Sequence, residues 1–485
     1  MKVGRRTLLS LVICCLLIMP GARPLSGLEG PGTSRLPTIG DAVSSSMSIS
    51  QERTLGEDLV RQIRRQLPLT DDLEVQGYLQ TLGERLLGHA EGPDFDYRFI
   101  MLDNPAINAF ALPGGQLGFN TGLFLRARSE HELASVVAHE IAHVTQRHIA
   151  RQLDLQRGGG LRTAGIVLMA ILLATQDADA GSAAAHLGIA ASIQEQLAYS
   201  REHEREADQI GIELMASAGF DPLGMASFFE RLQQAYQFRE EPPDYLSTHP
   251  LTSDRLREAR ARGQQLRSDS HRENPLFALM QTRLLIARAA SNDAARQHFQ
   301  TRLEAGLDDP ATRYGLALTL TEGNDPHAAV NILNDLIAEH GDLSAYYIAL
   351  ARAHMQAGDS EQGLDLFTLS QQLFPTNRAI IQYHAEALRS VDRQDAARAL
   401  LSRHRQLVVD EPVLLRLLAQ VDAELGNRDD SRMHMAEYYQ LQGQFDLAIR
   451  QLDQVVDASD ASLYHRSRAV ARRSALVELR SQLTQ

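Results

Sequence analysis

The sequence has very little cysteine and a shortage of positive charge. Its two cysteines, Cys14 and Cys15, are adjacent within an N-terminal apolar run. Without that run the chain can form no disulfide, and any metal site in it must use nitrogen and oxygen ligands. Asp and Glu number 61 against 48 for Lys and Arg, a formal net charge of −13. Because phosphate repels an acidic protein, this balance argues against nucleic acid binding.

Long apolar runs are also missing. The N-terminal run, 8–19, and a second one, 164–174, are both shorter than the roughly 20 residues of a membrane-spanning helix. The N-terminal run follows a basic start and precedes Pro20-Gly21-Ala22, which is the pattern of a secretory signal. We therefore predict a cleaved signal peptide over 1–27, with an uncleaved anchor as the alternative.

Tryptophan is absent, so the last third of the chain meets the tetratricopeptide consensus only in part. The spacing of its turn residues is regular, however. Gly323, Gly358, Asp392 and Gly426 are separated by 35, 34 and 34 residues. A period of 34 is typical of tetratricopeptide helix-turn-helix units, which stack into a solenoid with a concave surface. We predict such a solenoid over 273–485, with an irregular helical bundle as the alternative.

The residues before the solenoid indicate one domain of mixed structure. A flexible lead-in rich in Ser, Gly and Pro is expected over 28–50, and the domain itself over 51–272. Helical patterning dominates it, except that 95–120 has the short apolar runs and turns of two or three strands. Ser129 and Glu132 have the spacing of a capping box. The fold class is therefore predicted to be mainly α with a small β-sheet.

The pentapeptide His-Glu-Ile-Ala-His carries the chemistry. On a helix, His139 and His143 lie on one face, so both imidazoles can reach one metal ion. Glu140 lies beside them and can take a proton from a water molecule. This pattern is typical of a zinc hydrolase of the zincin type, which also needs a third protein ligand. The segment 200–208, SREHEREAD, offers three glutamates for that place: Glu202, Glu204 and Glu206.

The two motifs together resemble the gluzincin metallopeptidases related to the CAAX prenyl protease and the heat-shock protease HtpX. The resemblance implies one Zn²⁺ per subunit, held by His139, His143 and Glu204. It places Asp208 close to the zinc, as a catalytic residue that orients a ligand or donates a proton. The membrane-spanning helices of those relatives are not found in this sequence.

Further segments narrow the resemblance. NAFALPGG at 108–115 and STHPLTSDR at 247–255 make the layout similar to the periplasmic beta-barrel assembly-enhancing proteases. That resemblance implies export to the periplasm and substrates that are unfolded or stalled outer-membrane β-barrel proteins. It implies the barrel assembly machinery and the lipopolysaccharide-transport barrel as partners. It also implies that His249 is a fourth zinc ligand that keeps the enzyme latent.

Other segments keep alternatives open. The residues Asn108, Ala109, Phe110 and Ala111 bind substrate if 107–111 is an exposed edge strand, but they are structural if it is a buried hairpin strand. The hinge 158–160 and the run 164–174 fit a flap, a core helix or a peripheral contact with the outer membrane. Arg255 is expected to brace the loop around His249. His131, His148 and His203 are expected to be structural or surface groups.

These inferences converge on a periplasmic zinc metalloendopeptidase with chaperone-like activity. The rival hypothesis is a chaperone or scaffold whose solenoid does the binding, with a latent or structural zinc site. An intracellular peptidase would need residues 1–27 to stay uncleaved without causing export, which their composition argues against.

Overall fold

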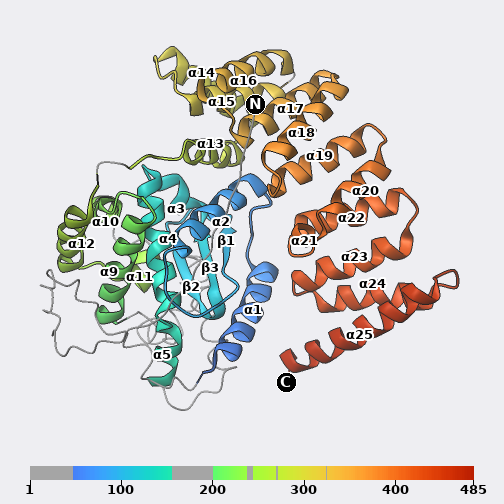
Figure 1. Ribbon diagram of the computed structural model, residues 1–485, viewed down its shortest axis with the longest axis horizontal. Helices are drawn as coiled ribbons and strands as arrows, with labels where there is room; N and C mark the ends of the chain where they lie inside the picture. The colour runs from blue at the N-terminus through green and yellow to red at the C-terminus, as the bar shows by residue number, and fades with distance from the viewer. Residues whose placement is uncertain (1–46, 156–199, 237–243, 269–270, 324, 485) are drawn as a thin grey trace, which may run out of the picture. The chain divides into compact units, whose positions relative to one another are not determined.

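The computed structural model describes residues 47–155, 200–236, 244–268, 271–323 and 325–484. The predicted signal peptide, most of the lead-in, and the segments 158–160 and 164–174 lie outside these ranges. Within the compact unit Ser45–Gln485, a mostly helical domain with one small sheet precedes an all-α solenoid, as the sequence predicts (Figure 1). Among the described helices, none is both long and apolar enough to cross a bilayer.

Two capped helices begin the described chain. Helix α1 (Ile49–Gln66) follows Ser48, whose hydroxyl accepts a hydrogen bond from the N–H of Gln51. The Gln51 side chain accepts one from the N–H of Ser48 in return. This reciprocal cap satisfies two backbone donors, so the helix begins two residues before the predicted boundary at 51. Helix α2 (Leu73–Leu87) follows, capped by Asp72.

Three short strands form the sheet, which confirms the strands predicted over 95–120. They are β1 (Arg98–Leu102), β2 (Ala109–Leu112) and β3 (Gln116–Asn120). The order is β1-β3-β2, with β1 parallel and β2 antiparallel to β3. Between β2 and β3 the chain reverses at Gly114, whose φ of 72° is a conformation that other residues rarely adopt. Within the described residues, β2 is therefore an edge strand.

A set of helices packs around this sheet. They are α3 (Thr121–Arg126), α4 (Glu130–Thr145), α5 (His148–Leu155), α9 (Arg201–Ser217), α10 (Leu223–Tyr236), α11 (Asp244–Thr248) and α12 (Ser253–Leu266). Helix α4 is the central one, since it is buried along nearly its whole length and contacts β2, α9 and α10. The predicted capping box at its start forms in part. Ser129 accepts from the N–H of Glu132, but the Glu132 carboxylate binds the N–H of Arg128.

The solenoid consists of consecutive helices joined by short turns. They are α13 (Leu276–Arg288), α14 (Asn292–Glu304), α15 (Pro310–Glu322), α16 (Pro326–His340), α17 (Ser344–Ala357), α18 (Ser360–Leu373), α19 (Arg378–Ser390), α20 (Gln394–Arg403), α21 (Arg405–Val408), α22 (Pro412–Glu424), α23 (Arg428–Leu441), α24 (Phe445–Asp457) and α25 (Leu463–Thr484). The predicted turn residues each follow a helix: Gly323, Gly358, Asp392 and Gly426. The last three have positive φ, which reverses the chain at a helix end.

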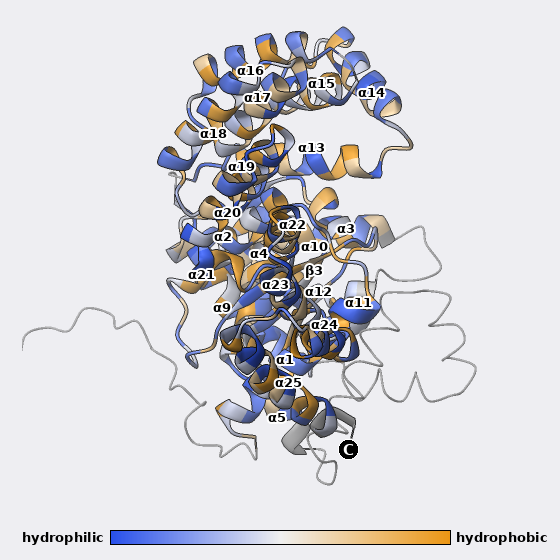
Figure 2. Ribbon diagram, turned by 90° about the vertical axis from the view of Figure 1, so that its right-hand side faces the viewer, coloured by the Kyte–Doolittle hydropathy of each residue, from blue (hydrophilic) through white to orange (hydrophobic). Residues whose placement is uncertain are grey.

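Each solenoid helix has an apolar face that its neighbours cover. Hydrophobic and hydrophilic residues alternate along the ribbons of α16–α19 (Figure 2). Leu333, Phe367 and Leu415 are examples of side chains that are almost fully buried in this packing. Sequential helices such as α15 and α16, or α22 and α23, contact each other closely. The solenoid is therefore stabilised mainly by contacts between neighbours in sequence.

A buried ion cluster joins α13 to α2. Arg283 Nη1 lies 2.6 Å from Glu74 Oε1, and Arg283 Nε lies 2.8 Å from Asp72 Oδ2. Replacing Arg283 with Met leaves two carboxylates near α2 without their cation, which is expected to lower the free energy of unfolding by about 3–5 kcal/mol. Urea unfolding followed by circular dichroism measures this loss.

The matched control for that substitution is an exposed ion pair of the same type. Arg296 Nη2 lies 2.7 Å from the largely exposed Asp293. Because water screens this pair, Arg296→Met is expected to cost less than about 1 kcal/mol. Equal effects of the two substitutions would contradict a special role for the buried cluster.

Candidate metal centre

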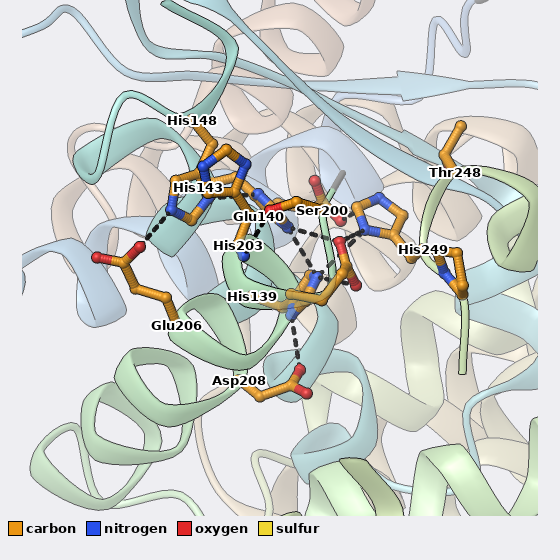
Figure 3. Close-up of polar contacts among 12 residues, drawn as sticks. His139, Glu140, His143, His148, Ser200, His203, Glu206, Asp208, Thr248 and His249 are labelled. Atoms are coloured by element: carbon orange, nitrogen blue, oxygen red, sulfur yellow. Dashed lines mark hydrogen bonds and ion pairs between the residues drawn. The ribbon is translucent and has the colours of Figure 1, made fainter. Parts of the chain in front are cut away.

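Helix α4 places the first three residues of the site. His139 and His143 are four positions apart and point to the same side of α4, with Glu140 beside them (Figure 3). All three side chains are 0–1% exposed. Apolar residues of α4 hold the helix in the core, and four of them are fully or almost fully buried: Val136, Val137, Ile141 and Val144.

Helix α9 brings Glu204 to the two histidines. It packs closely along α4, because its facing residues are small. A Cβ atom added to Gly211 would lie 3.3 Å from the backbone nitrogen of His139, and Ala207 one turn earlier is fully buried. Of the three candidate glutamates, only Glu204 is buried beside both histidines, whereas Glu202 is exposed. Glu206 points elsewhere, to His148.

His249 enters the site from a different element. The chain before His249, expected to be part of a loop, forms the short helix α11 instead, and His249 follows its last residue. Its N–H donates to the Tyr245 carbonyl at 2.9 Å, and its ring stacks on that of Tyr245 with centroids 4.7 Å apart. Arg255 Nη1 donates to the carbonyl of Pro250 at 2.8 Å, which confirms the predicted brace on this loop.

The four side chains meet at distances that suit one metal ion. His139 Nε2 lies 3.0 Å from His143 Nε2 and 3.2 Å from His249 Nδ1. Glu204 Oε1 lies 2.9 Å from His249 Nδ1 and 3.4 Å from His143 Nε2. The ligand atoms of a tetrahedral site with bonds of about 2.0–2.1 Å lie about 3.3 Å apart. This buried cluster therefore fits a tetrahedral metal ion in both ligand chemistry and spacing.

A carboxylate and a guanidinium orient the ligands from behind. Asp208 Oδ1 lies 3.0 Å from Nδ1 of His139, which leaves Nε2 of that ring facing the cluster (Figure 3). Both Asp208 oxygens accept hydrogen bonds from Arg255, at 2.7 and 2.9 Å. Arg255 also pairs with Glu204. Asp208 is thus an acceptor on both sides, which suits orienting His139 rather than donating a proton.

The two carboxylates of the centre differ electrostatically. Burial raises the pKa of Glu140 above its ordinary value, although His249 and His139 act in the opposite direction. Burial would also raise the pKa of Glu204, but His249 and Arg255 more than offset this and hold it well below its usual range. Glu140 is therefore the more basic of the two, and a group that accepts a proton needs this property.

The substrate-binding residues predicted from the sequence lie in or beside β2. Asn108, Ala109 and Ala111 are buried and Phe110 is half-buried. The strand contacts α4, which carries the centre. Just before it, the Ile107 carbonyl accepts a hydrogen bond from the N–H of Tyr245, next to the His249 loop. β2 is an edge strand of the sheet, as the substrate-binding hypothesis requires. Its side chains are mostly buried, as the hypothesis of a buried hairpin strand requires, so the two hypotheses do not exclude each other.

Sequence reasoning missed two features of this centre. His148 was expected to be a structural or surface group. It is buried, as a structural group would be, but its Nδ1 also lies 2.8 Å from Nδ1 of His143, which was not expected. Arg255 was expected only to brace the loop, but it also binds Asp208 and Glu204. The second role of Arg255 could have been inferred from the sequence, because two carboxylates buried near a metal site need a nearby buried cation.

Three comparisons place the chain among known proteins. The model of peptidase family M48 matches residues 74–263. The beta-barrel assembly-enhancing protease of Escherichia coli (strain K12) is 34% identical over 419 residues, which cover 85% of each chain. The putative beta-barrel assembly-enhancing protease of Vibrio cholerae serotype O1 is 33% identical over 445 residues, 90% of this chain and 91% of that one.

A more distant similarity covers part of the chain. The mitochondrial metalloendopeptidase OMA1 of Schizosaccharomyces pombe is 28% identical over 218 residues, 44% of this chain and 61% of that protein. The M48 match and the buried His and Glu cluster both indicate a metal ion. With similarity along most of its length to named members, the chain belongs to the family of beta-barrel assembly-enhancing proteases and is a metalloendopeptidase.

Proposed function

We propose that this protein is a periplasmic zinc endopeptidase that degrades misfolded or stalled outer-membrane β-barrel proteins and promotes the assembly of viable ones. The observation that carries the proposal is the buried cluster of His139, His143, Glu204 and His249 beside Glu140, in a chain similar throughout to beta-barrel assembly-enhancing proteases. Zinc is favoured because the ligands are imidazoles and one carboxylate in a tetrahedral spacing.

The proposed mechanism assigns one task to each side chain. When bound, zinc polarises a water molecule and the scissile carbonyl. Glu140 takes the proton of the attacking water and passes it to the leaving amine. His139, His143 and Glu204 would hold the metal, and Asp208 would keep His139 in the ligating orientation through the 3.0 Å contact. Burial of all these groups strengthens their electrostatic interactions.

The proposed substrate site is the outer edge of β2, which pairs with no further strand among the residues that the structure describes. An extended peptide that pairs with Asn108–Ala111 would use main-chain hydrogen bonds, which tolerate many sequences. That tolerance suits an unfolded β-strand of an outer-membrane protein. The contact between β2 and α4 supports this proposal, because Glu140 lies on α4.

Domain roles follow from the same proposal. Residues 51–272 form the peptidase and 273–485 the solenoid, whose concave surface is proposed to bind the barrel assembly machinery and the lipopolysaccharide-transport barrel. The name of the relatives, beta-barrel assembly-enhancing protease, supports a role in barrel assembly and an envelope location. Export by a cleaved signal at 1–27 is part of the proposal.

The alternative function is a chaperone or scaffold with a latent or structural zinc site. The position of His249 favours it, because four protein ligands are typical of structural zinc sites. His249 Nε2 also lies 3.4 Å from Glu140 Oε1, so the loop covers the proposed base. Both functions can operate in one molecule if the loop opens only with substrate.

Removing the metal tests the proposal directly. A chelator is expected to reduce cleavage of a denatured outer-membrane β-barrel protein to background, and stoichiometric Zn²⁺ is expected to restore it, because the proposed mechanism needs the metal to polarise the attacking water. Gel analysis of the fragments over time measures the rate, with the folded barrel in detergent as the control that resists cleavage. Cleavage that survives chelation would exclude a metal-dependent mechanism.

A further inference from the structure

His148 lies directly behind a ligand histidine, although its sequence position argues against this. It is five residues after His143, and on one continuous helix such residues point about 140° apart. The chain avoids this by ending α4 at Thr145 and starting α5 at His148. Between them, Arg147 adopts a φ of 53°, a conformation that residues with a side chain rarely adopt.

Contacts of the Arg147 side chain hold this break in place. Its Nε donates to Glu52 Oε1 and its Nη2 to the carbonyl of Met47, both at 2.7 Å. These bonds tie the break to α1 and to the residues just before it. A strained backbone conformation that two side-chain hydrogen bonds stabilise indicates that the placement of the next residue has a function. That residue is His148, which is fully buried.

The contacts of His148 form a chain that ends on a carboxylate. Its Nδ1 lies 2.8 Å from Nδ1 of His143, and its Nε2 lies 3.0 Å from Glu206 Oε2 (Figure 3). Arg151 Nη2 donates to the same Glu206 oxygen at 2.8 Å. On its other side the His148 ring stacks on His203, with centroids 4.4 Å apart and planes 14° apart. The ring is therefore held at both nitrogens and on one face.

These partners fix which nitrogens carry protons. A carboxylate accepts only, so His148 Nε2 must be the protonated nitrogen of a neutral ring. Its Nδ1 is then an acceptor, and the proton between the two Nδ1 atoms belongs to His143. His143 therefore has a bare Nε2, which is the atom that faces His139 and Glu204. Asp208 has the same effect on His139, because it accepts from Nδ1 and leaves Nε2 without a proton. For His143 this effect needs two residues, His148 and Glu206, instead of one.

We propose that His148, supported by Glu206, is a positioning residue that fixes the tautomer and the orientation of His143 for metal binding. The inference rests on the proposed metal centre. It gives Glu206 a role within the motif other than that of a metal ligand. Groups that orient a ligand histidine in this way typically contribute 10- to 100-fold to metal affinity.

The test is the zinc affinity of the full chain, measured by titrating the metal-free protein with Zn²⁺ in competition with a chelator of known affinity. His148→Leu removes both hydrogen bonds and is expected to weaken zinc binding by about 10- to 100-fold. His148→Asn places an amide oxygen near the position of Nδ1 and is expected to recover most of this loss. Glu206→Ala changes only a half-buried residue and is expected to cause a smaller loss in the same direction.

The control and the readouts separate positioning from a structural effect. His384 in α19 is also a buried histidine with a stacked ring, so His384→Leu is the matched change away from the centre and should leave zinc affinity unchanged. Melting with and without zinc adds a second readout. Weaker binding reduces the zinc-induced shift in Tm, whereas a purely structural role lowers the Tm of the metal-free and the zinc-bound protein alike and leaves that shift unchanged.

The outcomes distinguish a failure of the proposed metal centre from a failure of the positioning role of His148 and Glu206. If the parent chain binds no zinc, the metal centre itself is wrong. If the parent binds zinc, and both His148→Leu and Glu206→Ala bind it within twofold of the parent, the positioning role is excluded. If His148→Leu weakens binding and Glu206→Ala does not, the role of Glu206 is excluded and that of His148 stands.

Discussion

Replacing Glu140 with Gln is expected to reduce cleavage of an unfolded protein by about 10²–10⁴-fold, with the zinc content unchanged. Glutamine has nearly the same shape but cannot take a proton at neutral pH. Glu140 is fully buried, and burial raises the pKa of its carboxyl, so removing the charge should not destabilise the fold. Initial cleavage rates at equal zinc content measure the effect.

The control for this substitution is another glutamate that sequence reasoning considered for the site. Glu202 is exposed on α9, so Glu202→Gln should cleave at the parent rate. Both changes are best compared in the parent and in the His249→Ala background, so that latency does not hide the loss. A Glu140→Gln chain that still cleaves at the parent rate would mean that another group moves the proton.

Local patterns made much of this molecule predictable. His139 and His143 could be paired from the sequence because four residues nearly complete one helical turn. The turns at Gly358 and Gly426 could be placed because a helix end with positive φ favours glycine. The strands of 95–120 could be found because Pro113 and the glycines after it interrupt the apolar runs. The histidine pair and the strands are each indicated by residues close together in the chain, and the turns also by their regular spacing of 34 or 35 residues.

Features that depend on distant contacts could not be predicted in the same way. Arg255 binds Asp208, 47 positions earlier in the chain, and no local pattern specifies that pairing. His148 reaches His143 only because Arg147 adopts an unusual conformation, which a side chain from α1 stabilises. A helical reading of 139–148 directs His148 away from the centre. The parts that sequence reasoning missed are thus those set by packing between elements.

Replacing His249 with Ala is expected to accelerate cleavage. With His249 in place the centre has four protein ligands, whereas catalytic zinc sites keep one position open for water or substrate. The imidazole also lies 3.4 Å from Glu140, so the same side chain covers the metal position and the base. Tyr245 and Arg255 hold the loop in this closed position from two sides. In the proposed mechanism, every productive encounter must therefore first displace His249.

The size of the acceleration reports how firmly the loop is closed. If 99 of 100 molecules are closed, activity is limited to the open one, and removing the ring raises the rate by up to about 100-fold. Cleavage of an unfolded barrel protein at equal zinc content measures this. His271→Ala is the matched control, because that loop histidine contacts the Gly219 carbonyl rather than the centre.

A slower His249→Ala enzyme that retains its zinc would contradict latency, since it would mean that His249 assists the reaction. An acceleration would instead separate the two proposed functions of the chain. The closed form would leave the solenoid free to hold a substrate without cutting it, and cleavage would begin only when a bound strand displaces the loop.

Because the Ile107 carbonyl just before β2 accepts a hydrogen bond from the N–H of Tyr245, a peptide that pairs with β2 would act on the helix that directly precedes His249. Substrate binding at β2 and release of His249 are then expected to be coupled, so a peptide that pairs with β2 should activate the parent and have little effect on His249→Ala.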